Sequence, residues 1–203
     1  MRWKLPLLIS GVFVLAGSSL ALAADLFNRN KYESPNYEVV RTDGKFEIRN
    51  YSEMVVVSAK MEDGKSERNS AFRQLFKYIS GENEKQEKIA MTSPVFTTPA
   101  KGNQEGKGGV MSFVVPADVA KAGAPKADSD SVKVSKRAAG KFAVYRYSGR
   151  WTESRENSAK KTLKEWMEKD GLKATGQVEK ANYDPPFTPP FLRRNEVLVR
   201  IGS

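Results

Sequence analysis

Two stretches of the chain place apolar residues at the three- and four-residue spacing of an amphipathic helix. In residues 66–80 these positions are Ala71, Phe72, Leu75, Phe76 and Ile79. In residues 153–171 they are Ala159, Leu163, Trp166 and Met167, and Gly171 follows as a typical helix-ending residue. Apolar side chains with this spacing share one face, so we predict two helices that each pack on a sheet through that face.

Alternating apolar and polar residues predict strands on both sides of each helix. The chain reads YEVVR (37–41) and GKFEIRNYS (44–52) before the first helix, and VKVSK (132–136) and GKFAVYRYS (140–148) before the second. A glycine joins the two stretches of each pair, so we predict two β-hairpins. After the helices, further strands are predicted at VFTT (95–98), VMSFVVP (110–116), ATGQVEKANY (174–183) and EVLVRI (196–201).

The two GKF stretches indicate that the chain contains a repeat. Residues 44–52 and 140–148 coincide at five of nine positions, and Asn-Ser-Ala heads both helix faces after a shift of eight residues. Nine residues alone can match by chance, so the shared order of elements carries the interpretation. We interpret the chain as two pseudo-repeats, about 36–116 and 131–202, joined by a polar linker at 117–131.

This order of elements predicts an α+β fold. A doubly wound sheet needs regular alternation of strands and helices, and two units of hairpin, helix and strands do not supply it. We expect an antiparallel sheet, twisted or closed into a barrel, with two flanking helices and a cleft where the halves meet.

The start of the chain has a different character from the rest. A short basic stretch precedes an apolar or small run, Leu5–Leu22, and the small residues of a cleavage site. We predict a signal peptide over residues 1–24, cleaved near Ala23 or Ala24, and a periplasmic protein with one domain, residues 25–203. An uncleaved anchor is the alternative, because the run approaches the roughly 20 residues that span a bilayer.

Composition narrows the chemistry of the protein. The 203 residues carry a formal charge of +10 and include neither cysteine nor histidine. Disulfides, His or Cys metal sites and imidazole-based catalytic triads are therefore excluded. A basic exported protein attracts anionic groups, so we consider peripheral contact with an anionic membrane, or a small ligand with carboxylates. We expect no nucleic-acid partner, because no motif for reading nucleic acid is present.

Apolar and aromatic residues are the main candidates for a binding site. Phe72 and Phe76 lie one turn apart on the first predicted helix, although core packing is the simpler interpretation for both. Met91 and Phe96 belong to the stretch KIAMTSPVFTTP, residues 88–99, which carries no charge after Lys88. Pro94 divides this stretch into an irregular part and a strand.

The segment YDPPFTPPFLRRNEV is the most unusual part of the sequence. Its four prolines impose a stiff, extended backbone that cannot join a central strand. We expect one of its arginines to form a structural ion pair with Glu196. A flat apolar surface with basic residues at its rim suits a planar hydrophobic molecule that carries carboxylates. The segment displays Phe187, Phe191, Arg193 and Arg194.

Three motifs, taken in order, resemble those of the SOUL heme-binding protein family: KYISGEN (77–83), KIAMTSPV (88–95) and YDPPFTPPFLRRNEV (183–197). The stretch YEVVRTDGKFEIRNYSE (37–53) resembles the opening of that family, and the similarity extends to about Ile201. This resemblance implies a distorted antiparallel β-barrel of gyrase-inhibitor-like architecture, built from a duplicated half with two flanking helices. It also implies that the protein binds heme or another porphyrin.

The resemblance places the ligand beside the first helix, with a contribution from the late loop around Phe187 and Phe191. Where some members have an iron-binding histidine, this chain has none, and Tyr78 and Met91 are the weak candidates that remain. Heme can also bind without side-chain ligation, with its propionates paired to Arg73, Lys77 or the late arginines. The helix positions that the resemblance implies are Asn69, Phe72, Phe76 and Lys77.

We therefore expect an exported, non-enzymatic tetrapyrrole-binding protein that acts as a scavenger, buffer or carrier. The alternative from another class is an envelope interaction module that binds a peptide or an amphipathic helix in the same cleft. An enzyme acting on tetrapyrroles is less favoured, because the sequence offers no paired carboxylates in an apolar setting.

Overall fold

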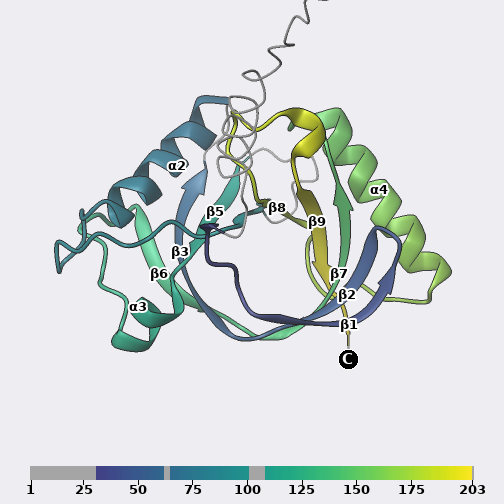
Figure 1. Ribbon diagram of the computed structural model, residues 1–203, viewed down its shortest axis with the longest axis horizontal. Coiled ribbons are helices and arrows are strands. Elements are labelled where there is room, and N and C mark those ends of the chain that lie inside the picture. Colours follow the sequence, from purple (N-terminus) through teal and green to yellow (C-terminus); the bar gives the residue numbers. More distant parts are fainter. Residues whose placement is uncertain (1–30, 62–64, 101–107, 203) are drawn as a thin grey trace, which may run out of the picture. The chain divides into compact units, whose positions relative to one another are not determined.

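The computed structural model describes residues 31–61, 65–100 and 108–202. They form an α+β fold, as predicted, in which helices α2 and α4 pack on one face of an antiparallel sheet (Figure 1). The helices are α2 (Lys65–Ile79), α3 (Ala117–Ala122) and α4 (Glu153–Lys169), with a 3₁₀ turn, η2, at Pro190–Leu192. The strands are β1 (Tyr37–Asp43), β2 (Phe46–Tyr51), β3 (Met54–Met61), β4 (Val95–Thr98), β5 (Gly109–Val114), β6 (Val132–Arg137), β7 (Gly140–Tyr147), β8 (Glu179–Asn182) and β9 (Asn195–Arg200).

All of these elements belong to one unit, Tyr32–Ser203. The predicted signal peptide lies outside the described residues. Within residues 31–61, 65–100 and 108–202, no helix is both long enough and apolar enough to cross a membrane.

The sheet has two free edges. Its strand order is β1-β2-β7-β9-β8-β4-β5-β3-β6, and all eight pairings are antiparallel. Strands β1 and β6 end this order, so the sheet curves strongly but does not close (Figure 1). The barrel implied by the family resemblance is therefore not confirmed.

The two halves of the chain exchange a strand. The first predicted hairpin is confirmed as β1 and β2, with Gly44 at φ +57° in its turn. The second is wrong, because β6 pairs with β3 while β7 pairs with β2 and β9. Each half thus places one strand, β2 or β6, in the sheet of the other half.

Strand β3 is absent from the sequence prediction, and it changes how the halves correspond. From the central pair outwards, one half runs β4-β5-β3-β6 and the other runs β8-β9-β7-β2. Strand β3 therefore occupies the place of β7. The sequence match between residues 44–52 and 140–148 compares β2 with β7, which are neighbours rather than equivalents. The offset of 88 residues between Asn69 and Asn157 instead places β3 near β7 and α2 on α4.

Arg200 contacts the segment between β6 and β7, where the turn of the second hairpin is predicted. Its guanidinium donates hydrogen bonds to the carbonyl oxygens of Ala138 and Ala139, both at 2.7 Å. A Cβ atom on Gly140 would lie 1.7 Å from Nη1 of Arg200, so only glycine leaves room for this contact. The glycine that suggested a hairpin turn permits the close approach of an arginine to a chain that continues into β7.

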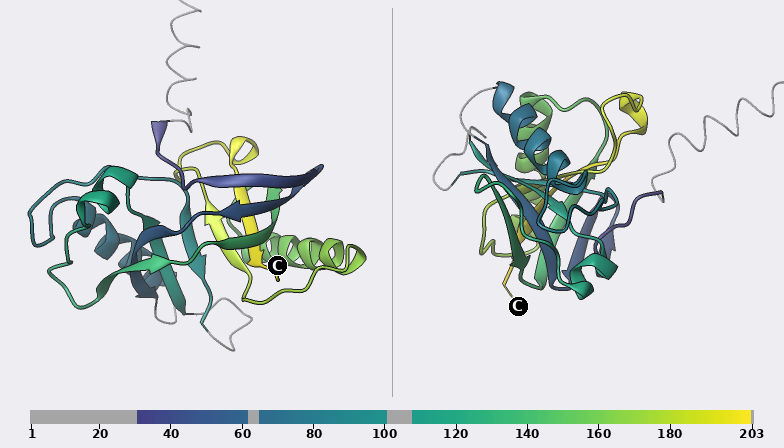
Figure 2. Two further views of the ribbon diagram at one scale, coloured as in Figure 1. Left: turned by 90° about the horizontal axis from the view of Figure 1, so that it is seen from below. Right: turned by 90° about the vertical axis from the view of Figure 1, so that its left-hand side faces the viewer.

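Each helix covers one half of the sheet, and Figure 2 shows both helices on the same side of it. Leu75 of α2 is fully buried in a cluster with Phe113 of β5. Leu163 of α4 is buried in a second cluster with Val197 of β9. Helix α4 therefore packs through the apolar face that its spacing predicts, whereas α2 packs through Ala71, Leu75 and Ile79 and leaves Phe72 and Phe76 partly exposed.

The opposite face of the sheet holds a third cluster. Phe142 and Leu198 lie next to Ala143 and Val197 of the second cluster, so they point to the other face, where they pack with Tyr51 and Phe96. The rings of Tyr51 and Phe142 meet edge-on, with centroids 5.4 Å apart. No described helix covers this face, and the curvature of the sheet brings its side chains together.

Several local predictions are confirmed. Helix α4 ends before Gly171 at φ +68°, and the Leu172 N–H donates to the Met167 carbonyl at 2.9 Å. VFTT forms β4, and residues 88–94 before it form no strand. The polar linker, however, contains α3.

We expect Leu75→Ala and Leu163→Ala each to lower the free energy of unfolding by about 2–5 kcal/mol, because each leaves a cavity beneath a helix. Urea denaturation measures the change. Val40→Ala is the control, since Val40 is 51% exposed and should change stability by less than about 1 kcal/mol. A small loss in either leucine variant would contradict the packing described.

Candidate functional site

Five of the predicted ligand-binding residues share the outward side of α2. Phe72 is 40% exposed and Phe76 is 50% exposed, an unusual amount for large aromatic side chains. Their rings stack with centroids 6.2 Å apart and planes inclined by 14°. Asn69, Arg73 and Lys77 are exposed beside them. We call these five residues the α2 face.

The core supports the aromatic part of the α2 face. Phe72 contacts Phe113 of β5 with ring centroids 5.3 Å apart, so its orientation is fixed from below. Lys77 has only an exposed ion pair with Glu82, at 3.2 Å, which contributes little and leaves the ammonium accessible. The α2 face therefore combines a flat apolar surface with two cations.

A cavity of about 240 Å³ lies between α2 and the segment that leads into β6. Arg73 and Lys77 line it from the helix, and Asp128 and Ser129 line it from the other side. Ligand pockets for small molecules commonly measure about 300–1,000 Å³, so the cavity is too small to enclose a macrocycle. It is large enough for a side group such as a carboxylate.

The two candidate iron ligands are not presented as ligands. Tyr78 is 1% exposed, and its hydroxyl donates to the Pro125 carbonyl at 2.8 Å. Burial, with a smaller effect of Glu84, raises the pKa of Tyr78 to about 12. Met91 is half-buried and packs against the same core cluster as Phe113. No group of acidic side chains in the described part of the chain could hold a metal ion.

Phe96 lies in the core, away from the α2 face. It is 1% exposed in the third cluster, on the side of the sheet opposite the helices. The Arg137 guanidinium lies over its ring at 4.5 Å. Residues 88–99 thus contribute mainly to the fold.

In the proline-rich loop, residues 183–194, the phenylalanines are exposed and the arginines bind groups of the protein itself. Phe187 and Phe191 are 70% and 77% exposed. Arg193 donates from Nε to the Thr188 carbonyl at 2.7 Å and from Nη2 to the Pro186 carbonyl. Arg193 therefore holds the loop in shape.

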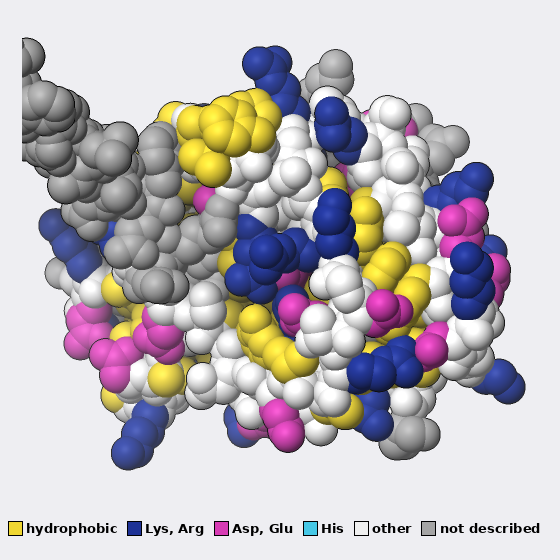
Figure 3. Space-filling view, turned by 45° about the vertical axis from the view of Figure 1, so that its right-hand side comes forward, with side chains coloured by type: hydrophobic (Ala, Val, Ile, Leu, Met, Phe, Trp, Pro, Cys, Tyr) yellow, Lys and Arg dark blue, Asp and Glu magenta, His cyan; other side chains and the backbone are white. Residues whose placement is uncertain are grey.

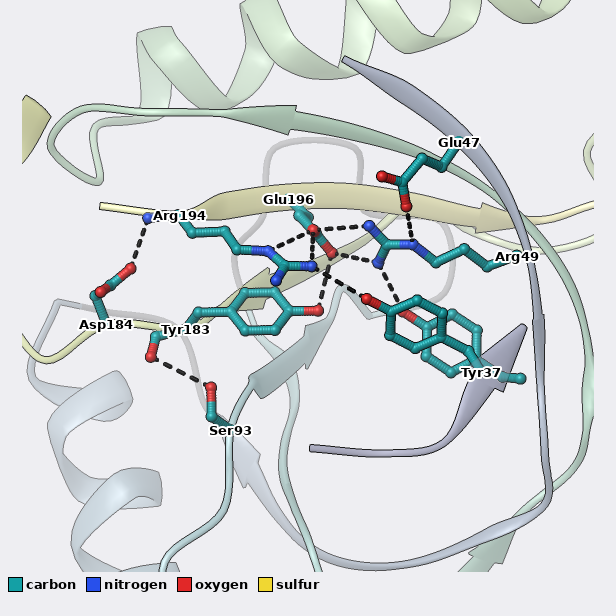
Figure 4. A network of polar contacts seen from close by, with 9 residues as sticks. Tyr37, Glu47, Arg49, Ser93, Tyr183, Asp184, Arg194 and Glu196 are labelled. Atoms are coloured by element: carbon teal, nitrogen blue, oxygen red, sulfur yellow. Dashed lines mark hydrogen bonds and ion pairs between the residues drawn. The ribbon is translucent and has the colours of Figure 1, made fainter. Parts of the chain in front are cut away.

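Arg194 forms the structural ion pair expected with Glu196. Its Nε and Nη2 lie 2.8 and 2.7 Å from Oε1 of the fully buried Glu196 carboxylate. Arg49 of β2 binds the same carboxylate through both terminal nitrogens, at 2.8 and 2.9 Å, and the Tyr183 hydroxyl donates to it at 3.0 Å (Figure 4). Arg49 also donates to the Tyr51 hydroxyl at 3.0 Å. This set is the Glu196 network.

The Glu196 network keeps its charges inside the protein. Burial would raise the pKa of the Glu196 carboxyl, but the hydrogen bonds and positive charges of Arg49 and Arg194 outweigh it and lower that pKa. Burial and the neighbouring Glu196 carboxylate both raise the pKa of Tyr183, so its hydroxyl stays protonated. The network is therefore a fixed ionic structure and has no proton to transfer near neutral pH.

A second polar cluster, also absent from the sequence prediction, lies at the start of α4. The Glu156 carboxylate accepts from Lys160 and from Lys180 of β8, both at 2.8 Å. Burial lowers the pKa of Lys180, against the opposing effect of Glu156. Thr97, the cross-strand partner of Lys180, carries the one buried side-chain polar atom without a hydrogen-bond partner among the described residues. No motif signals this cluster, because its members are common surface residue types and Lys180 lies 24 residues from Glu156.

Comparison with protein families decides the identity of the fold. The family model for SOUL heme-binding proteins matches residues 32–200. The chain belongs to the SOUL heme-binding protein family. No curated protein matches the chain in sequence.

Several solved structures share the fold of this chain although their sequence identity to it is low. The EcmrR C-terminal domain has a TM-score of 0.59 at 12% identity, covering 82% of this chain and 98% of that one. An uncharacterized conserved protein from Listeria innocua has a TM-score of 0.59 at 13% identity, with coverages of 78% and 92%. A hydrolase from the same organism has a TM-score of 0.55 at 14% identity, with coverages of 80% and 94%. These similarities concern the fold alone.

In this SOUL-family chain, the motif YDPPFTPPFLRRNEV has mainly a structural role. Arg193 shapes the loop, Arg194 and Glu196 form the buried network, and Asn195 accepts from Trp151 at 2.6 Å. Neither arginine is free to pair with a ligand carboxylate, which leaves Arg73 and Lys77 on the α2 face for that role.

We expect Glu196→Gln to lower the free energy of unfolding at pH 7 by about 3–5 kcal/mol, because the buried Arg49 and the partly buried Arg194 lose their counter-charge. The folded-state pKa of Glu196 is below its unfolded value of about 4.3, so its stabilisation is complete above that pH and is lost as the pH falls. Urea denaturation from pH 7 to pH 3 should show the two proteins converging in stability.

Glu53→Gln is the matched control for the Glu196 substitution. Glu53 forms an exposed ion pair with Lys136 at 2.8 Å, so its loss should cost less than about 1 kcal/mol. Equal losses in both variants, or a constant difference between the Glu196 variant and the parent at all pH values, would contradict the account of the network.

Proposed function

We propose that the protein is an exported, non-enzymatic tetrapyrrole-binding protein that acts as a scavenger, buffer or carrier. The proposal rests on the α2 face, where two stacked, exposed phenylalanines lie between cationic side chains. Membership of the SOUL heme-binding family supports a tetrapyrrole as the class of ligand. The apolar run at Leu5–Leu22 supports export.

The macrocycle lies on the α2 face and is not enclosed. Its flat apolar surface covers Phe72 and Phe76, which removes their exposed area from water. One of its carboxylate groups enters the cavity lined by Arg73 and Lys77. This arrangement accounts for an exposed aromatic pair next to a cavity that is too small for the whole ligand.

The iron contributes little to affinity in this proposal. The chain has no histidine or cysteine. The buried Tyr78 hydroxyl donates to the Pro125 carbonyl, and the half-buried Met91 packs against a core cluster. Binding therefore depends on apolar contact and on pairing of carboxylates, and metal-free porphyrins bind as heme does. A site without controlled axial ligation suits storage or transport better than redox catalysis.

We expect hemin and metal-free protoporphyrin to bind residues 25–203 saturably, with dissociation constants within about threefold of each other, since no side chain ligates the iron. Phe72→Ala/Phe76→Ala should weaken both at least about tenfold, because burial of one phenylalanine contributes about 1.5–3 kcal/mol. Absorbance titration in the Soret region measures both ligands.

Val39→Ala/Val40→Ala is the control for the hemin titration, because it removes two side chains of similar exposure, 45% and 51%, from β1. It should leave both dissociation constants unchanged. If neither porphyrin gives a saturable signal, or if both double variants weaken binding equally, the proposed function is wrong.

A further inference from the structure

The tip of the proline-rich loop is the most exposed apolar surface in the described part of the chain. Phe187 and Phe191 are 70% and 77% exposed, and the neighbouring Trp151 is 38% exposed. We propose that these three side chains, the aromatic tip, insert into the interfacial region of an anionic lipid membrane. Figure 3 shows hydrophobic side chains gathered at the top of the molecule, where the loop lies in Figure 1, with basic side chains beside them.

The aromatic tip is held outward by the rest of the fold. Thr188, between the two phenylalanines, is 2% exposed and anchors the loop. The Gly149 N–H donates to the Pro190 carbonyl at 2.9 Å, which ties the loop to the segment that carries Trp151. Arg193 binds two loop carbonyls and lies 5.3 Å from the centre of the Trp151 ring. With four prolines and these contacts, the loop cannot fold back to bury its phenylalanines.

Basic side chains lie beside the aromatic tip. Arg150 and Arg155 are exposed and flank Trp151 in the sequence, the Arg193 guanidinium lies 5.3 Å from the centre of its ring, and Glu153 is the one acidic residue between positions 149 and 155. Each basic residue near an anionic membrane surface strengthens binding by about fivefold. Peripheral membrane binding requires aromatic side chains that enter the bilayer interface together with nearby basic side chains that contact the headgroups.

The chain enters the fold beside the same loop. The Glu33 carbonyl accepts from the Ser93 N–H at 2.8 Å, and the Ser93 hydroxyl donates to the Tyr183 carbonyl at 3.3 Å. Glu33 and Ser93 therefore lie next to the start of the proline-rich loop.

A lipid surface fits the aromatic tip better than a second copy of the chain. A stable protein interface buries about 800 Å² on each partner, far more than three side chains supply. Three arginines facing three arginines would also repel each other across a symmetric contact. An anionic membrane offers headgroups of the opposite charge. Its acyl chains form a fluid apolar layer that accepts aromatic side chains without a complementary surface.

The test uses residues 25–203, which include the whole described fold and omit the apolar run. Sedimentation with vesicles of phosphatidylcholine mixed with an equal part of phosphatidylglycerol should show binding, and vesicles of phosphatidylcholine alone should bind at least tenfold more weakly. Phe187→Ser/Phe191→Ser should reduce binding to the anionic vesicles at least tenfold. Arg150→Gln/Arg155→Gln should reduce it about tenfold or more and flatten its salt dependence.

Trp151 reports its own insertion. In Trp166→Phe it is the only tryptophan of residues 25–203, so anionic vesicles should shift its emission to the blue and brominated lipids should quench it. Phe72→Ala/Phe76→Ala is the matched control, because it removes two exposed phenylalanines from α2 and should retain vesicle binding. The urea midpoints of all variants establish that they are folded.

Three outcomes would overturn the proposal. The first is unchanged vesicle binding in the Phe187→Ser/Phe191→Ser variant, and the second is equal binding to neutral and anionic vesicles. The third is self-association that depends on Phe187 and Phe191 without vesicle binding, which would assign the aromatic tip to a second copy of the chain. None of these outcomes depends on hemin binding, so the membrane proposal and the proposed function fail independently.

Discussion

A single buried carboxylate, that of Glu196, joins parts of the chain that are distant in sequence. Arg49 reaches it from β2 and Arg194 from the proline-rich loop, so the network links both halves of the molecule. A buried carboxylate or guanidinium without its partner costs several kcal/mol, and each of these groups is therefore stable there only when the others are in place. The exchanged position of β2 and the placement of the loop depend on the same ionic contact.

The Glu196 network also explains how a loop with four prolines keeps one shape. Asp184 accepts from the Arg194 N–H at 2.6 Å, and Asn195 donates to the Gly149 carbonyl at 3.0 Å, so the loop is fixed at its start and near its end. Polar side chains of the loop hydrogen-bond to groups inside the protein, whereas Phe187 and Phe191 are left exposed to solvent. The distinctive motif therefore encodes a support, and the residues that it supports are the ones available to a partner.

The two long helices and most strands could be predicted from the sequence, because each depends on local spacing. The same spacing favoured core packing for Phe72 and Phe76, which the structure leaves 40% and 50% exposed. The Arg194–Glu196 pair could be predicted too, since its members lie two residues apart on adjoining segments. The Arg49 contact could not, because 147 residues separate it from Glu196 and only the strand order brings them together. The same reason accounts for the wrong second hairpin: pairing of β6 with β3 is non-local, and the GKF similarity favoured a local turn.

In the proposed function, the absence of histidine would give the α2 face a different kind of selectivity from that of a ligated heme site. Axial ligation rewards one metal and one coordination geometry, whereas stacked phenylalanines and two cations reward a flat shape and negative charge. Such a site releases its ligand when another apolar surface offers equal burial, because no coordination bond has to break. Low discrimination and ready release are the properties that a carrier needs, and a redox catalyst would need their opposite.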